Sequence, residues 1–490
     1  MDSKQESRRT ILGSSSLIGG ASVLSLLIGL VKVKILAVFL GPAGIGLLGI
    51  YQNTLQVGST FGSMGAPTVA TRKIASVANS DEGVASSIAS LTRFSILLAI
   101  SGAVAVGLCC QWIMLSLFSL EIGSTEVAVL SLGVFLAVVG GVRVGILQGL
   151  RRVRSLAAVN VLAAALAATI GSCAVILLGQ EGLILFVVSM PLATLVFAFV
   201  VSRGNLTLKL RATIERESRL WRQTFVEGAP LMCSALAGAI MLLVIRAILV
   251  SRLGIDQAGY FQATWAISMT YVGVVLGALA TDYYPRLSML AHDDRESAEL
   301  VTQQIEIALL LIGPAVLALI VFAPLVMQLL YSSSFGPAAE LLRWQLLGDV
   351  FKVASWPLGF ILLARGRGVH FLALELAWNL LVLGMTWYLV PLLGLLGFGV
   401  AFVVAYILYL VVMLGYARYT IGFRFEKRTA GYFALIFGCC FACAVLLPAD
   451  SYFVGSIAIL ASTAFSLFQL DRLVDIRSLL RKSAGQSGDV

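Results

Sequence analysis

The fold of this chain is decided by a stretch near its start, which reads Lys32-Val-Lys34-Ile-Leu-Ala-Val-Phe-Leu40-Gly41-Pro-Ala-Gly-Ile-Gly46. A second copy of the pattern follows, and it reads Arg246-Ala-Ile-Leu-Val-Ser-Arg-Leu253-Gly254-Ile-Asp-Gln-Ala-Gly259. Each copy ends an apolar segment with a Leu-Gly pair and places another glycine at the same distance beyond it, so one constant offset relates the two. The sequence therefore predicts two related halves, each with cations inside an apolar helix.

The composition around these stretches is that of a membrane protein. The 490 residues are 59% hydrophobic and only 12% charged, whereas a soluble domain carries about 25% charged residues. A helix needs about 20 apolar residues to cross the hydrocarbon core of a bilayer. Fourteen segments meet this length, which predicts an all-α integral membrane protein with spans at 14–40, 43–65, 84–109, 124–148, 156–178, 182–202, 222–251, 257–284, 299–323, 339–364, 370–391, 396–417, 429–448 and 452–470.

The placement of the basic residues predicts the orientation of the chain. The net charge is +9, and with a cytoplasmic N-terminus nearly all loop cations fall on the inner side, while the outer loops contribute only Arg252. By the positive-inside rule, both termini are expected in the cytoplasm. Because the charge is spread over a membrane face, nucleic-acid binding is not expected.

The repeat extends to the fourth span of each half. Gly145-Ile-Leu-Gln-Gly-Leu-Arg151 maps onto Gly359-Phe-Ile-Leu-Leu-Ala-Arg365 at an offset that differs by only one position from that of the opening stretch. Six spans per copy is an even number, so the copies share one orientation and form a parallel repeat. The expected organisation is two pseudosymmetric six-helix bundles, at residues 1–202 and 222–420, joined by an amphipathic cytoplasmic linker at 203–221. A terminal helix pair with a cytoplasmic tail follows at 421–490.

Cations inside the spans are the first candidates for a site. A cation at the centre of a bilayer costs about 2.5–3.5 kcal/mol on insertion scales, so it needs a reason. Paired cations in two halves predict a basic cavity for an anionic substrate. Lys34 can instead extend to the outer interface, and Arg143 can be an anchor at the inner face. The predicted cavity cations are Lys32, Lys34, Arg143, Arg246 and Lys352.

Three carboxylates in the second half are candidates for ion coupling. Asp349 and Lys352 lie three residues apart and share one helix face, so they either neutralise each other or separate when Asp349 takes a proton. Glu306 and Glu375 lie near the inner ends of their spans, where they are either interfacial or relay protons. An ion or proton gradient is the expected driving force, with no cofactor.

Polar side chains in the second and eighth spans are candidates for sugar contacts. Polar groups in hydrocarbon need partners or water, and amides, hydroxyls and aromatic faces suit sugar rings. The alternative is hydrogen bonding between helices. The candidates are Tyr51, Gln52, Asn53, Gln56, Gln262, Trp265 and Tyr271.

Several classes of function are excluded or disfavoured. The chain has no phosphate-binding loop and no nucleophile motif, which argues against ATP hydrolysis. Cys440-Phe-Ala-Cys443 lies in an apolar span without nearby basic residues, so a metal or redox site is not expected. The short outer loops leave no room for the catalytic domain of a polymerase or ligase. A transporter is predicted, not an enzyme.

The first stretch and its continuation also resemble a known family. Lys34 to Gly46, with Gly65-Ala-Pro67 and Thr71-Arg-Lys-Ile-Ala75, is similar to the Wzx-type O-antigen and enterobacterial-common-antigen lipid flippases. These belong to the multidrug/oligosaccharidyl-lipid/polysaccharide (MOP) exporter superfamily. Many such flippases have twelve spans, so the chain departs in its additional pair, which is closer to the flippases for peptidoglycan lipid II.

The resemblance implies two six-helix bundles around a cationic cavity. It implies alternating-access transfer of an undecaprenyl-diphosphate-linked oligosaccharide, such as an O-antigen unit, from the inner to the outer leaflet. Membrane lipid, a polysaccharide polymerase and a chain-length regulator are the implied partners. The alternative is a cation-coupled multidrug exporter of the same superfamily. That class would be expected to carry a carboxylate in the first span, where this chain has lysines instead.

Overall fold

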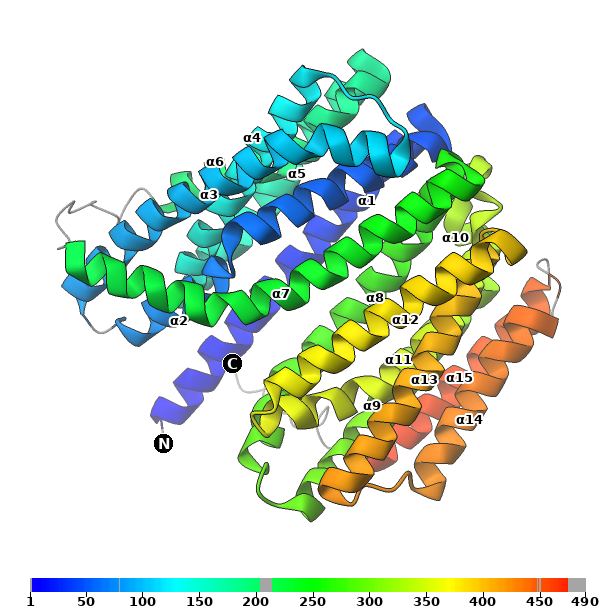
Figure 1. Ribbon diagram of the computed structural model, residues 1–490. Coiled ribbons are helices and arrows are strands. Elements are labelled where there is room, and N and C mark those ends of the chain that lie inside the picture. The colour runs from blue at the N-terminus through cyan, green and yellow to red at the C-terminus, as the bar shows by residue number, and fades with distance from the viewer. Residues whose placement is uncertain (1, 79, 203–213, 447, 449–450, 475–490) are drawn as a thin grey trace, which may run out of the picture. The chain divides into compact units, whose positions relative to one another are not determined.

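The computed structural model describes residues 2–78, 80–202, 214–446, 448 and 451–474, and every regular element among them is a helix (Figure 1). This confirms the predicted all-α fold. The helices are α1 (Asp2–Ser63), α2 (Ala66–Ser76), α3 (Asp81–Phe118), α4 (Ser124–Gly149), α5 (Val153–Leu178), α6 (Gly182–Ser202), α7 (Ile214–Leu253), α8 (Ile255–Met289), α9 (Asp294–Val321), α10 (Ala323–Leu330), α11 (Ala338–Ala364), α12 (Gly368–Leu393), α13 (Leu396–Ile421), α14 (Lys427–Phe441) and α15 (Tyr452–Val474).

Twelve helical stretches in the described residues are long and apolar enough to cross a membrane. The sequence predicts fourteen spans, and the difference lies in two long stretches, Gly20–Ser63 and Val153–Ser202, which hold two predicted spans each. Both stretches are broken by a glycine in the left-handed region. Gly41 interrupts α1 with φ of 62°, and Gly179 separates α5 from α6 with φ of 61°.

The same backbone turns recur in the second half of the chain. Gly254 follows α7 with φ of 94°, and Gly394 follows α12 with φ of 60°. In the order of the repeat, Gly254 corresponds to Gly41, and Gly394 takes the place of Gly179 between the fifth and sixth spans. Positive φ is readily available only to glycine, so these positions fix where each repeat unit turns. The repeat seen in the sequence is thus also a repeat of local backbone geometry.

The chain folds as two compact units. The first contains Met1–Gly259 and Leu330–Ser332, and the second contains Tyr260–Leu329 and Ser333–Val490. Helix α7, which the sequence analysis assigns to the second bundle, packs in the first unit against α1, α2 and α3. The limits of the two bundles, which the sequence analysis takes from the internal repeat, remain a prediction. The helix contacts place α7 in the same compact unit as the first six spans.

Most of the predicted linker at 203–221 lies outside the described residues, and only the start of α7 is described. There Trp221 stacks on Phe94 of α3, with ring centroids 5.3 Å apart, and its Nε1 donates to Ser90 Oγ at 3.2 Å. The end of the linker is therefore attached to the first unit by an aromatic side chain.

A reciprocal glycine contact joins the two copies of the opening stretch. A Cβ atom added at Gly46 would lie 2.5 Å from the carbonyl oxygen of Ile255, and one added at Gly259 would overlap the carbonyl oxygen of Pro42. The offset that relates Gly46 to Gly259 also relates Pro42 to Ile255. Each copy thus presents the same surface to the other, which is the pattern of a two-fold axis.

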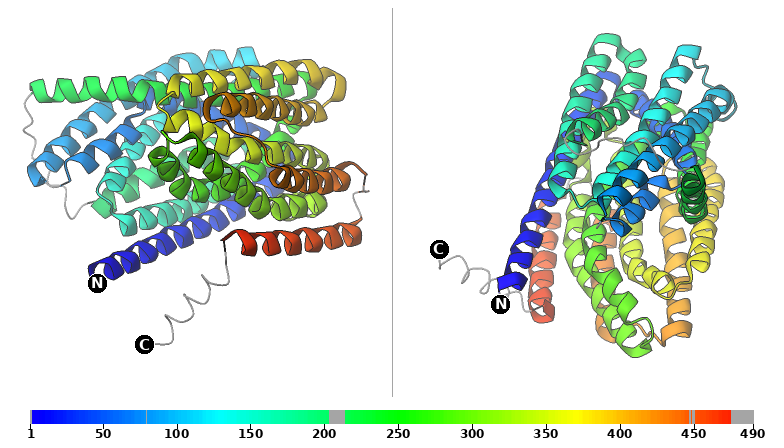
Figure 2. Two further views of the ribbon diagram at one scale, coloured as in Figure 1. Left: turned by 90° about the horizontal axis from the view of Figure 1, so that it is seen from below. Right: turned by 90° about the vertical axis from the view of Figure 1, so that its left-hand side faces the viewer.

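The terminal helix pair packs on α9 in the second unit (Figures 1 and 2). Tyr432 of α14, Leu470 of α15 and Leu310 of α9 form one buried cluster. Tyr432 also donates its hydroxyl to Gln469 Oε1 at 3.0 Å, so a polar contact fixes α14 against α15. The two extra helices are an integrated part of the second unit.

Replacing Gly259 with valine is expected to destabilise the first unit. The new side chain would overlap the Pro42 carbonyl, and overpacking of this kind costs about 1–3 kcal/mol. The melting temperature of the purified protein in detergent should fall. Gly238→Ala is the control, because a Cβ atom there meets nothing within 4 Å. Equal melting temperatures for the two variants would show that the reciprocal contact is unimportant.

Candidate functional site

Arg246 is held at the contact between α7 and α1. Its side chain is only 4% exposed, and Nη1 donates to Asn53 Oδ1 and to the carbonyl oxygen of Leu242, the latter at 3.2 Å. Asn53 in turn donates from Nδ2 to the carbonyl oxygen of Ala239 at 2.9 Å. The predicted cavity cation and the predicted sugar-contact residue Asn53 therefore form one polar contact, and these hydrogen-bond acceptors are neutral oxygens.

Lys32 points toward α6. Its Nζ donates to the carbonyl oxygen of Phe186 and to Ser189 Oγ, both at 3.2 Å, and lies 3.9 Å from the centroid of the Phe186 ring. A cation over an aromatic face is stabilised by the ring quadrupole, and more strongly where water is excluded. Lys34, two residues further along α1, is half-buried.

Arg143 of α4 is buried and also contacts α6, where its guanidinium lies 4.2 Å from the centroid of the Phe199 ring. Phe186 and Phe199 are thirteen residues apart on α6, which corresponds to about 20 Å along a helix. The first unit therefore does not gather its predicted cations at one point. Lys32 and Arg143 contact opposite ends of α6, and Arg246 contacts α1.

The polar residues of the second span divide between packed and open positions. Tyr51 and Asn53 are buried, whereas Gln52 and Gln56 are exposed and lie one turn apart on the same side of α1. Gln52 and Gln56 therefore present their amide groups at the surface of α1. They are the members of the predicted sugar-contact set in this unit that a ligand can reach.

Asp349 and Lys352 of α11 have separate hydrogen-bond partners on α8. Asp349 is completely buried, and its Oδ2 accepts a hydrogen bond of 2.7 Å from Ser268 Oγ. Lys352 Nζ donates to Met269 Sδ at 3.2 Å. Within the described residues the two charges interact electrostatically but form no ion pair. Their spacing along α11 makes them neighbours, but each charged group forms its hydrogen bond with a different residue of α8.

Glu375 of α12 completes this charged group. It is half-buried and interacts electrostatically with Lys352. Lys352 also lies 6.0 Å from the centroid of the Tyr406 ring, which packs on Trp378 at 4.9 Å. The second unit therefore assembles one ammonium group and two carboxylates beside an aromatic wall contributed by α12 and α13.

Gln345 is a member of this polar face that the sequence analysis missed. Gln345, Asp349 and Lys352 lie at helical spacings of four and three residues, so they share one face of α11. Gln345 is completely buried, and neither of its amide atoms has a partner among the described residues. The same is true of Asp349 Oδ1. The helical spacing in the sequence was the signal that could have revealed it.

The predicted sugar contacts of the eighth span lie along α8 of the second unit. Gln262 is half-buried. Trp265 packs edge-on against Phe398 and Phe402, with centroids 6.2 and 5.9 Å away. The hydroxyl of Tyr271 is buried without a partner among the described residues and interacts electrostatically with Asp349. Trp265 is thus part of an aromatic cluster, while Tyr271 belongs to the polar face around Asp349.

Glu306 has a structural contact with the terminal helix pair. Its completely buried carboxylate accepts hydrogen bonds from Arg428 Nε at 3.0 Å and Nη2 at 2.7 Å, and from Thr429 Oγ1 at 2.7 Å. This two-pronged ion pair joins α9 to α14 and satisfies the carboxylate. Its role in ion coupling remains a prediction, and the contact that the structure shows is an anchor.

Comparisons with known proteins identify the relatives of this architecture. A family described as Polysaccharide biosynthesis protein matches residues 11–291. The Lipid III flippase of Escherichia coli (strain K12) is 24% identical over 405 residues, which cover 79% of this chain and 93% of that protein. The relative is named as a flippase and not as an enzyme.

Solved structures show the same fold. An inward-facing multidrug resistance MATE family transporter of the MOP superfamily matches with a TM-score of 0.68 and 19% identity, covering 81% of this chain and 94% of that one. The Lipid II flippase MurJ in an inward closed conformation matches with a TM-score of 0.65 and 12% identity, covering 93% and 99%. The predicted MOP-type fold is confirmed.

Replacing Arg428 with glutamine is expected to loosen α14 from α9. The variant leaves the buried Glu306 carboxylate without its ion-pair partner, which should cost about 1–3 kcal/mol because the Arg428 side chain is 52% exposed. The melting temperature in detergent should fall, and Glu306→Gln in the same chain should restore part of it. Arg295→Gln is the control, because its ion pair with Glu299 is exposed. Equal stabilities of the Arg428 and Arg295 variants would contradict the anchor.

Proposed function

We propose that this chain, which belongs to the polysaccharide biosynthesis protein family, is a flippase for a lipid-linked oligosaccharide. Its substrate is an undecaprenyl-diphosphate-linked O-antigen or related repeat unit, which it moves from the cytoplasmic to the periplasmic leaflet. The protein lies in the inner membrane of a bacterium with both termini in the cytoplasm, and it works by alternating access. Its proposed protein partners are a polysaccharide polymerase and a chain-length regulator.

The observation that carries the proposal is the presence of three cations inside apolar, membrane-spanning helices of the first unit. Lys32, Arg143 and Arg246 contact carbonyl, hydroxyl and amide oxygens or aromatic rings. An anionic headgroup such as a diphosphate compensates these charges when it passes, and a cationic drug does not. The segment Gly20–Leu40 contains no carboxylate, which separates this chain from the expectation for a cation-coupled multidrug exporter.

The other polar groups have roles that follow from their positions. In the first unit the exposed amides of Gln52 and Gln56 contact sugar hydroxyl groups, and Gln262 is the candidate for the same role in the second unit. The polyprenyl tail stays in membrane lipid. Asp349 binds and releases a proton or cation, because it is a completely buried carboxylate with one oxygen that has no partner among the described residues. An ion or proton gradient therefore drives the cycle, and no cofactor takes part.

The charge of Arg246 can be tested separately from its structural role. Arg246→Gln is expected to lower surface glycan about tenfold or more, since a hydrogen bond to a charged group contributes about 1.5–3 kcal/mol. Arg246→Lys should retain part of the export, because it keeps the charge. Asn53→Ala removes the Asn53 contact while leaving the arginine in place. Surface glycan is measured at equal amounts of protein in the membrane.

Arg252→Gln is the matched control, because Arg252 is on the same helix and is exposed. If Arg246→Gln gave wild-type glycan at normal protein levels, the proposed role of this cation would be wrong. Export of a labelled cationic drug by the reconstituted protein, with unchanged glycan in all variants, would favour the multidrug exporter.

Asp349→Asn tests the coupling proposal. Asparagine preserves an acceptor for Ser268 Oγ but no longer takes up a proton. In proteoliposomes, transfer of a lipid-diphosphate oligosaccharide should lose its dependence on an imposed proton or sodium gradient, while binding of the substrate is retained. Glu340→Gln, at an exposed position on the same helix, should behave as the wild type. If transfer by the Asp349→Asn variant still depended on the gradient, Asp349 would not be the group that couples ion movement to transport.

A further inference from the structure

A cavity of about 500 Å³ lies at the end of α13, beside the segment that connects it to α14. Its volume is within the range of small-molecule sites, which is about 300–1,000 Å³. None of the predicted site residues lines it. The walls are formed by Leu414, Gly415, Arg418, Phe423, Arg424 and Phe425.

The charged groups in the wall of this cavity all have the same sign. Arg418 and Arg424 are exposed, no carboxylate lines the cavity, and neither arginine forms an ion pair within the described residues. Two guanidinium groups beside aromatic side chains are suited to a phosphate, because arginine binds it through paired N–H donors.

A neighbouring cavity has a different charge pattern. The second cavity, of about 470 Å³, shares Phe423 and Arg424 with the first. Its wall also contains three carboxylates, those of Asp294, Glu299 and Glu426. There, Glu299 binds Arg295 at 3.1 Å and Asp294 binds Arg365. Of these two cavities, only the one at α13 has basic side chains in its wall and no carboxylate.

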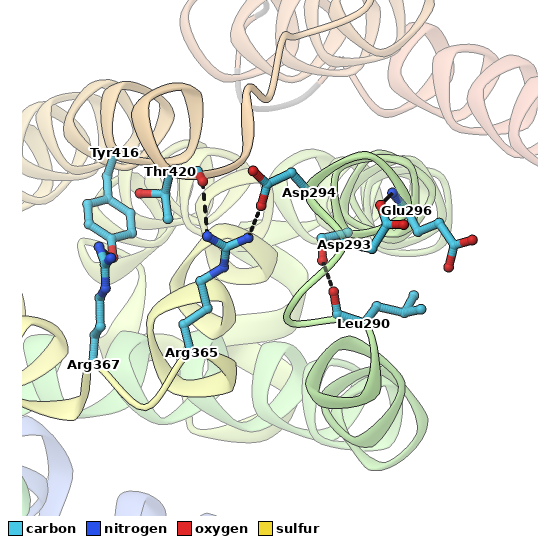
Figure 3. Close-up of polar contacts among 9 residues, drawn as sticks. Leu290, Asp293, Asp294, Glu296, Arg365, Arg367, Tyr416 and Thr420 are labelled. Carbon is cyan, nitrogen blue, oxygen red and sulfur yellow. Dashed lines mark hydrogen bonds and ion pairs between the residues drawn. The ribbon is translucent and has the colours of Figure 1, made fainter.

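Other arginines nearby are already engaged, and they fix the ends of the helices. Arg365 lies between Asp294 and the carbonyl oxygen of Thr420, to which its Nη1 donates at 3.0 Å (Figure 3). Arg367 Nη1 donates to the hydroxyl of Tyr416 at 3.1 Å. These contacts tie α9 and the α11–α12 connection to the last turns of α13. The frame around the cavity is held by other cations, and Arg418 and Arg424 are left to face it.

An apolar stripe on α13 leads to the cavity. Leu408, Val411 and Tyr419 are 43%, 60% and 87% exposed, and Gly415 continues their spacing of three or four residues. Such residues share one helix face. The cavity therefore lies where an exposed apolar helix face ends at two arginines. A lipid has the complementary arrangement, because its apolar acyl chains end at a charged headgroup.

We propose that this cavity binds the phosphate headgroup of an anionic membrane glycerophospholipid, with the acyl chains lying along the exposed face of α13. The positive-inside pattern predicts that this end of α13 faces the cytoplasm, where anionic lipids concentrate and attract basic segments. The lipid is a resident of the site and not the transported molecule. The inference rests on the geometry of the second unit and on the orientation predicted from the basic residues, and it does not depend on the transported substrate.

The test compares lipid binding by the full-length protein and by charge variants. Purified protein is titrated with phosphatidylglycerol or phosphatidylcholine, and bound lipid is counted by native mass spectrometry. The wild type should prefer phosphatidylglycerol. Arg418→Gln and Arg424→Gln should each weaken this binding about fivefold, and the double variant about 25-fold, since one basic residue contributes about 1 kcal/mol near an anionic surface. Arg295→Gln, which changes only the neighbouring cavity, should bind as the wild type.

Gly415→Leu provides a test that leaves both arginines intact. A Cβ atom at Gly415 meets nothing within 4 Å, so the larger side chain can enter the cavity without disturbing the helix. It should lower phosphatidylglycerol binding with an unchanged melting temperature. Wild-type lipid binding by both this variant and the double arginine variant would overturn the proposal. So would tight binding of inorganic phosphate without any preference for phosphatidylglycerol over phosphatidylcholine, because the ligand would then be a soluble phosphate.

Discussion

The close approach of α1 and α7 is the constraint on which the first unit depends. Helices in a membrane gain little from the hydrophobic effect, so they associate through tight backbone packing at small residues. At one end of this interface, Gly46 of α1 packs against the carbonyl of Ile255, which begins α8 directly after α7. At the other end, Gly65, between α1 and α2, approaches Gly228 of α7, and an added Cβ atom would lie 2.6 Å from the Gly228 carbonyl oxygen. The second span rises about 27–29 Å between these contacts, which is close to the thickness of the hydrocarbon core.

Arg246 lies within this same interface. Between the two glycine contacts of the interface, Asn53 accepts a hydrogen bond from Arg246 and donates one to the carbonyl oxygen of Ala239. A membrane-embedded arginine is tolerated here because neutral oxygens from both helices solvate it. Arg246, which we propose to interact with the anionic headgroup, is therefore also part of the packing between α1 and α7.

The sequence predicts the fold well because membrane spans and glycine turns are local properties. The correspondence between Gly41 and Gly254 identifies both the repeat and the positive φ angles that the structure shows there. The partners of individual side chains are long-range properties. Spacing places Asp349 beside Lys352, but Ser268 and Met269 on α8 decide what each group binds. Lys32 could face either side of α1 by periodicity, and only the packing of α6 directs it to Phe186.

The polar face of α11 shows why a membrane transporter keeps groups that a stable core would exclude. Gln345, Asp349 and Tyr271 bury polar atoms that have no partner among the described residues, and each such atom costs about 1–3 kcal/mol. Well-packed apolar residues in their place would avoid that cost. Groups of this kind are retained where water or an ion can reach them during part of a cycle, because the ligand then supplies the missing hydrogen bonds. Since Asp349 is the only carboxylate in α11 beyond its first turn, a bound proton or cation would neutralise the one negative charge on this face of the helix. The orphaned polar atoms and the coupling role proposed for Asp349 therefore have one physical explanation.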